Sequence, residues 1–200
     1  MRVEMAFKYR RLSPFFLLGR LAKYELEDVD RFLAWSDQQR RGRQRYLEKL
    51  PSSDGPDDQF VDDFAEIGAF TSLYTESAIV ALWRCIELFR KRTIAQALGP
   101  AQAKSVYRHR DFSNALARLR ISEPKVRCAR SVDELRCINN AVKHEGRVGR
   151  ELAAYPRWKN RQGEELGNLR LHYARLRSLT ERYIEDLMTK ATRWWERKPA

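Results

Sequence analysis

The feature that most constrains this chain is one long stretch of helical periodicity. Across residues 57–98, apolar side chains recur every three or four positions, as one buried face of an α-helix requires. The stretch ends at Gly99-Pro100, because glycine readily adopts the left-handed conformation that closes a helix and proline cannot continue one. A fifth of the 200 residues therefore belongs to a single predicted helix.

The rest of the chain also gives helical signals, and no segment shows the convincing alternation of a strand. Ser13-Pro14 is a typical helix start, and the helix it opens runs toward residue 50, with Gly42 as a predicted break or end. Ser131 and Glu134 are spaced as a capping box. We expect a loop over residues 51–56, short helices over 101–108 and 112–119, a turn over 122–124, a helix over 131–146, an irregular connection over 146–167 and a last helix over 168–195.

Composition indicates one ordinary domain over residues 1–200, with no clear helical pattern in residues 1–12. Hydrophobic residues are 43% and charged residues 33%, which is not a disordered composition. No apolar run approaches the roughly 18 residues of a membrane span, and we see no signal peptide. The three cysteines form no CxxC pair, which argues against a disulfide framework and a thiolate zinc site and favours a reducing, cytoplasmic location.

The charge of the chain is concentrated in one segment. Residues 101–160 carry 14 basic and 6 acidic residues, which is +8 of the total net charge of +12. A concentrated positive field favours an anionic partner, and nucleic acid is the first candidate. An Arg-rich composition without functional meaning is the alternative.

Three polar side chains share one face of the predicted helix over residues 131–146. Arg136, Asn140 and His144 are spaced by four and form a row roughly opposite the apolar cluster of Val132, Leu135, Ile138 and Val142. The small residues Cys137 and Ala141 flank the row and would allow another helix to approach. The row is either plain surface or an interface.

Residues 134–146, ELRCINNAVKHEG, resemble the motif helix of the HEPN superfamily, the higher eukaryotes and prokaryotes nucleotide-binding domain. The resemblance covers about residues 60–190 and implies an all-α fold, a helical bundle with two long antiparallel helices plus shorter helices. Asn139 stands where the family usually has arginine, Asn140 occupies the polar position that follows, and His144 is the motif histidine.

The resemblance implies a metal-independent endoribonuclease of toxin or antiviral-defence type, without a cofactor. It implies a homodimer with a composite RNA cleft, and a toxin would have a nucleotidyltransferase-type antitoxin as partner. His144 would be the acid or base, and Asn140 would orient the phosphate. Arg136, or as second choice Lys143, would supply a cation in place of Asn139. Lys143, Arg147 and Arg150 would bind RNA.

Two alternatives remain from the sequence. One is a non-catalytic relative of the same fold that binds RNA, a nucleotide or a protein through the same face, and Asn139 in place of arginine favours it over the enzyme. The other is an unrelated helical interaction protein. Other enzyme classes find little support, because the sequence has no Walker loop, GxGxxG, HExxH or GxSxG motif.

Overall fold

The computed structural model describes residues 13–49, 58–106, 108–144 and 146–197, with only the backbone described over residues 58–64. These ranges are mainly helical, and their only β pairing is an isolated bridge between Arg147 and Glu165, so the predicted all-α class is confirmed. No helix in them is long and apolar enough to cross a lipid bilayer. The helices are α1 (Pro14–Leu47), α2 (Asp58–Leu98), α3 (Pro100–Lys104), α4 (His109–Arg118), a 3₁₀ turn (Glu123–Lys125), α5 (Ala129–His144), α6 (Arg150–Ala153), a second 3₁₀ turn (Pro156–Trp158) and α7 (Leu169–Glu196).

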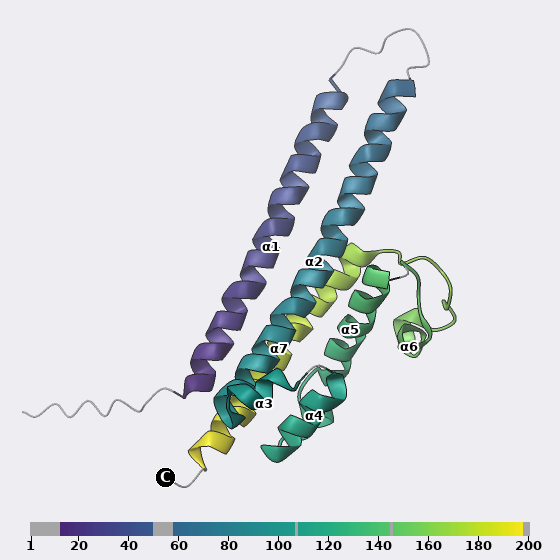
Figure 1. Cartoon of the computed structure of the whole chain (residues 1–200). Coiled ribbons are helices and arrows are strands. Elements are labelled where there is room, and N and C mark those ends of the chain that lie inside the picture. The colour runs from purple at the N-terminus through teal and green to yellow at the C-terminus, as the bar shows by residue number, and fades with distance from the viewer. Residues whose placement is uncertain (1–12, 50–57, 107, 145, 198–200) are drawn as a thin grey trace, which may run out of the picture.

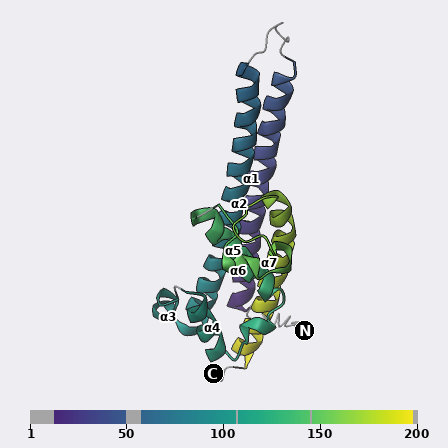
Figure 2. The ribbon, with the colours of Figure 1, turned by 90° about the vertical axis from the view of Figure 1, so that its right-hand side faces the viewer.

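The two long helices run antiparallel side by side, as predicted, and α7 packs against both of them (Figure 1). The halves of α1 and α2 nearest to residues 48–57 extend past the other helices, which gather at the opposite half (Figure 2). α5 packs on α2 and α7, and α6 packs on α5. One side of α5 is therefore held by the bundle, and α6 partly covers another.

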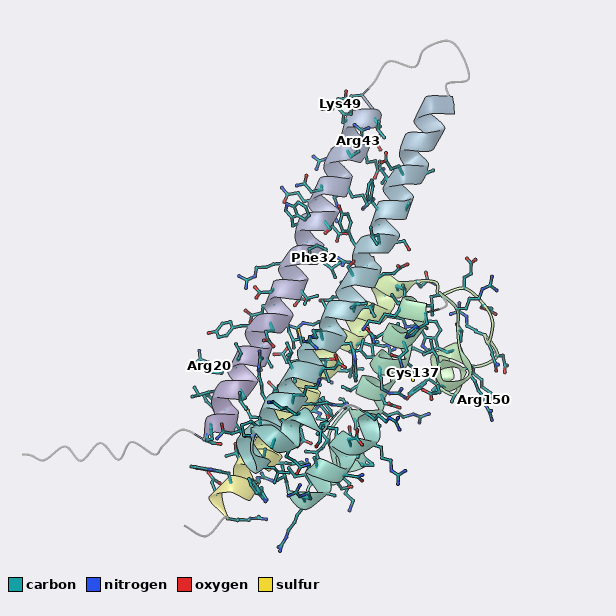
Figure 3. All side chains as sticks on the ribbon, viewed as in Figure 1. Arg20, Phe32, Arg43, Lys49, Cys137 and Arg150 are labelled. Atoms are coloured by element: carbon teal, nitrogen blue, oxygen red, sulfur yellow. The ribbon has the colours of Figure 1, made fainter. Side chains whose placement is uncertain are left out.

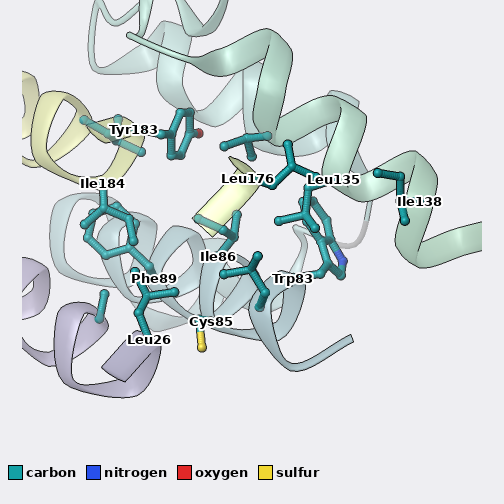
Figure 4. Packing of buried hydrophobic residues seen from close by; sticks show 14 of the residues in the cluster. Leu26, Trp83, Cys85, Ile86, Phe89, Leu135, Ile138, Leu176, Tyr183 and Ile184 are labelled. Atoms are coloured by element: carbon teal, nitrogen blue, oxygen red, sulfur yellow. The ribbon is translucent and has the colours of Figure 1, made fainter. Parts of the chain in front are cut away.

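Apolar side chains between α1, α2, α5 and α7 form one continuous core (Figure 4). Leu26 of α1, Ile86 of α2, Leu135 of α5 and Ile184 of α7 are all fully excluded from solvent. Removing a side chain of this size from water contributes roughly 1.5–3 kcal/mol. This core fixes the position of α5 relative to the long helices.

Most helix ends follow the signals in the sequence. Ser13 Oγ accepts a hydrogen bond from the backbone N–H of Phe15, and Pro14 takes the first helical position. Gly99 has a φ of +97° where α2 ends, and Pro100 begins α3. The predicted break at Gly42 is wrong, because α1 continues to Leu47. A single glycine costs a helix only about 1 kcal/mol, which is too little to end a helix of this length.

The predicted capping box of Ser131 and Glu134 is also wrong. α5 begins two residues before Ser131, directly after Cys128, whose backbone is left-handed with a φ of +60°. Glu134 instead accepts hydrogen bonds from Trp158 Nε1 at 3.0 Å and from Arg175 at 2.6 Å. Its carboxylate therefore joins α5 to the connection after it and to α7.

The connection between α5 and α7 is irregular, as predicted, but it contains α6 and a 3₁₀ turn. Trp158 at the end of that turn is fully buried, and its ring stacks on His172 of α7 with 4.2 Å between ring centroids. Burial, together with the nearby positive charge of Arg175, lowers the pKa of His172. This stacked pair fixes the connection against α7 and thereby places α6 beside α5.

Candidate functional site

The two faces of α5 differ as the sequence predicts. Leu135 and Ile138 are fully buried against the bundle, whereas Asn140 and His144 are exposed on the other side and Arg136 is partly exposed. Residues spaced by four lie on one side of a helix, so the three polar side chains form the predicted row. The row is directed away from the core.

The small residues beside the row are covered by the same chain. Cys137 is buried on the side of α5 that faces α6, and its thiol lies 3.7 Å from Glu151 of α6, with Arg150 farther out (Figure 3). The expectation that Cys137 and Ala141 leave room for a separate helix is therefore corrected, because α6 packs there. Burial raises the pKa of the Cys137 thiol to about 12, although the positive charge of Arg136 acts in the opposite direction, so the thiol is not a ready nucleophile.

Arg136 is held between two carboxylates. Its Nε donates to Asp133 at 2.7 Å, and one terminal nitrogen donates to Glu151 at 3.0 Å. Burial alone would lower the pKa of Arg136, but the contacts with Asp133 and Glu151 outweigh it and raise that pKa. Burial alone would raise the pKa of Asp133, yet hydrogen bonds from Arg136 and Tyr155 leave it lowered. The guanidinium is thus permanently charged and largely neutralised by its neighbours.

Asn139 does not belong to the exposed row. It follows Leu135 by one helical turn, and its side chain is only 1% exposed. Its amide nitrogen lies 3.3 Å from the Asn140 amide oxygen, while its own amide oxygen has no hydrogen-bond partner among the described residues. The position that corresponds to the motif arginine therefore faces the interior of the bundle.

Two hollows border the row and share Arg136 and Asn140 in their linings. One, of about 310 Å³, lies toward α2 and α4 and is lined by Arg90, Lys91 and Arg108 among others. The other, of about 370 Å³, lies toward α6. Among the described residues, the two linings together carry six lysine or arginine side chains and two carboxylates, from Glu87 and Glu151. The row thus crosses a positively charged depression.

Some of the site residues predicted from the sequence line this depression, and others do not. Arg147 and Arg150 line the α6-side hollow together with His144, Asn140 and Arg136. Arg147 also donates to the backbone oxygen of Gly163 at 3.2 Å. Lys143 is exposed but lines neither hollow, and Asn139 is buried.

The α2-side hollow contains residues that the sequence did not point to. Arg90 is buried beside the hollow and is paired with Glu123 at 2.9 Å. His109 lies 3.7 Å from the same carboxylate and lines the hollow with Arg108. The run Arg108-His109-Arg110 is visible in the sequence as a basic segment. Arg90 carries no such signal, because it lies in a segment without excess positive charge.

Other chemistries lack a matching arrangement in the described part of the chain. No group of three or more His, Cys, Asp or Glu residues there is placed to hold a metal ion. All three cysteines are free thiols. Comparison with known protein families, curated proteins and solved structures finds no match for this chain.

Proposed function

We propose that the chain is a HEPN-like, metal-independent endoribonuclease that binds RNA across the exposed face of α5. The observation that carries this proposal is the Asn140–His144 face, which lies within two adjoining, positively charged hollows. An exposed imidazole beside exposed arginines supplies one acid–base group and the cations for RNA cleavage, and the nucleophile belongs to the RNA.

Binding would be mainly electrostatic. Arg147 and Arg150 stand at the edge of the hollow that contains His144, and both side chains are exposed. Lysine and arginine side chains bind phosphates and release counterions, so affinity falls as salt rises, with a slope of about −0.7 per phosphate for single strands. Asn140, which is exposed on the same row, would orient a phosphate or a base edge.

Cleavage would begin with the ribose 2′-oxygen attacking the adjacent phosphorus, while the bond to the 5′-oxygen breaks. An imidazole can take the proton of the 2′-hydroxyl or give a proton to the leaving oxygen. The products are a 2′,3′-cyclic phosphate and a 5′-hydroxyl end. Arg147 or Arg150 is better placed than Arg136 to stabilise the charge of the transition state, because two carboxylates already neutralise Arg136.

A homodimer would supply the second acid–base group. Isologous pairing of two exposed α5 faces brings two copies of His144 into one cleft. Because α6 covers Cys137, we expect this contact to centre on Asn140 and His144. A toxin of this kind would act in the cytoplasm and be held inactive by a nucleotidyltransferase-type antitoxin.

One observation favours the non-catalytic alternative. Asn139, which is buried, stands where the resemblance would place an arginine, and Arg136, one turn earlier on α5, is engaged with Asp133 and Glu151. A HEPN-like module that binds RNA, a nucleotide or a protein without cutting needs no free cation beside the imidazole. The cleavage assay below separates the two functions.

The test is RNA cleavage in excess EDTA, with His144→Ala and His144→Gln as variants. His144 is exposed, so both variants should keep the wild-type Tm, while loss of a general acid or base should slow cleavage about 10²–10⁴-fold. An inert wild type that still binds RNA supports the non-catalytic module instead.

RNA binding is tested separately, by comparing two pairs of charge-reversal variants. Charge reversal of Arg147 and Arg150 should weaken binding more than reversal of Arg40 and Arg41, which lie on α1 outside the two hollows. Equal losses at both pairs would show that the α5 face is not the binding surface.

A further inference from the structure

A second positively charged pocket lies at the end of the bundle where α7 ends. It has a volume of about 680 Å³ and shares no lining residue with the two hollows beside α5. Three segments form it: the end of α4, the connection that follows α4, and the last turns of α7. Among the described residues its lining contains no carboxylate. It contains six lysine or arginine residues, namely Arg118, Arg120, Lys125, Lys190, Arg193 and Arg197.

Four of these cations have no carboxylate partner among the described residues. Lys190 is paired with Asp186, and Arg118 donates to Gln102. Within the described part of the chain, no carboxylate lies within ion-pair distance of the remaining four side chains, Arg120, Lys125, Arg193 and Arg197. Like charges gathered around one concavity repel one another and raise the local affinity for anions.

The backbone at Arg120 makes a glycine variant suitable as a test. Arg120 has a φ of +56°, in the left-handed region that glycine normally occupies at the end of a helix. The backbone N–H of Ile121 bonds to the Leu116 oxygen at 3.0 Å, which completes the usual helix-terminating turn around Arg120. Replacing Arg120 by glycine therefore removes a cation from the pocket without disturbing the end of α4.

The shape of the pocket favours a small anion over a long strand. Its cations come from segments about 70 residues apart in sequence and converge on one hollow, whose volume is within the usual range of small-ligand sites, about 300–1,000 Å³. A terminal phosphoryl group carries a charge of about −1.5 to −2 at pH 7. A chain of two or three phosphoryl groups therefore matches the charge of the four cations that have no carboxylate partner among the described residues. Trp194 adds an aromatic surface to the lining.

We propose that this end pocket binds a small polyphosphate, either free or as part of a nucleoside polyphosphate. The proposal does not depend on RNA cleavage at α5. Arg120, Arg193 and Arg197 would hold the phosphoryl oxygens by charge-assisted hydrogen bonds, which arginine makes in bidentate fashion. If the ligand carries a base, Trp194 is the aromatic side chain in the lining against which that base would lie.

The experiment is calorimetric titration of the full chain with inorganic tripolyphosphate and, separately, with ATP, at low and moderate salt. We expect binding that weakens with salt. Tighter binding of ATP than of tripolyphosphate would identify a nucleotide, and equal binding would identify the phosphate chain alone. Absence of binding by both probes at millimolar concentration would overturn the proposal.

Two variants locate the binding. Arg120→Gly removes one cation from a position that favours glycine, so the protein should keep or raise its Tm while affinity falls about tenfold or more. Arg193→Ala, at an exposed position of α7, should lower the affinity for tripolyphosphate by a similar factor. The matched control is Arg41→Ala, at an exposed position of α1 that lines none of the three hollows, which should leave tripolyphosphate binding unchanged.

The outcomes separate this proposal from the proposed function. Wild-type affinity for both probes in Arg120→Gly and Arg193→Ala would refute the pocket. Loss of tripolyphosphate binding with unchanged RNA cleavage would support it as a separate site. If instead a single-stranded oligoribonucleotide binds in a manner that needs Arg120 while tripolyphosphate does not bind, the pocket is an RNA surface and the proposal is wrong.

Discussion

Replacing Glu123 by glutamine should strongly destabilise this protein, because it leaves a buried arginine without its counter-charge. The side chains of Arg90 and Glu123 are only 6% and 5% exposed, and their charged atoms lie 2.9 Å apart. Arg90 also donates to the Tyr183 hydroxyl at 3.1 Å and lies over the ring of Phe112, 4.6 Å from its centroid. The hydroxyl of Ser113 donates to the second carboxylate oxygen. The ion pair therefore joins α2, α4, α7 and the turn after α4.

The size of the effect follows from burial. Removing one partner of a buried ion pair costs about 3–5 kcal/mol, whereas replacing both by neutral side chains is often close to neutral. Glu123→Gln keeps the shape of the side chain and removes only the charge. For a chain of this size 1 kcal/mol shifts Tm by roughly 2–4 °C, so we expect Tm to fall by about 6–20 °C.

A double-mutant cycle in urea tests this reasoning. Arg90→Met and Glu123→Gln should each lower the free energy of unfolding, and the double variant should lose clearly less than their sum. Asp28→Asn is the control, because the Asp28–Arg31 pair is about 70% exposed on both sides and should leave Tm unchanged. Strictly additive losses, or a Glu123→Gln loss as small as that of the control, would refute the account of a buried ion pair.

Three further predictions test other parts of the structure. Asn139→Arg, which introduces an arginine at a buried position, should lower the free energy of unfolding in urea by about 3–5 kcal/mol, because it buries an unpaired charge; an unfolding midpoint equal to that of the wild type would contradict this. His172 has a lowered pKa in the folded protein, so the unfolded chain binds the proton more tightly and stability should fall as pH drops below about 6.5 toward that lowered value. His172→Phe keeps a ring against Trp158 and should flatten Tm between pH 7 and 5, which an unchanged pH profile would disprove. Gly99→Ala should cost about 1–3 kcal/mol in urea unfolding, because a φ of +97° with a ψ of 159° is accessible almost only to glycine; an unchanged midpoint would show that the backbone there can adjust.

Local pattern determined much of this protein. The periodicity of residues 57–98, the Ser13-Pro14 start and the Gly99 end were sufficient for the all-α class and for the two long helices. The same periodicity separated the buried face of α5 from the face with Asn140 and His144. These features depend on residues within one or two helical turns of each other, and the spacing of such residues can be read from the sequence.

Tertiary structure alone decided how the charges are used. Glu134 looked like a helix cap, but it accepts hydrogen bonds from Trp158 and from Arg175, 41 residues away. Arg136 looked like a free cation, but Glu151 of α6 folds back onto it. In each case the partner lies on another element, and its distance depends on how the helices pack.

The buried Arg90–Glu123 pair and the end pocket also depend on contacts between residues that are distant in sequence. Glu123 is 33 residues from Arg90, and the pocket at the end of α7 joins residues about 70 positions apart. Sequence indicates that a side chain is charged, but whether that charge meets a carboxylate, solvent or other cations depends on contacts made only after the helices pack. The sequence by itself therefore determined the helices and their apolar faces, while packing determined which of the many arginines remain available to bind an anion.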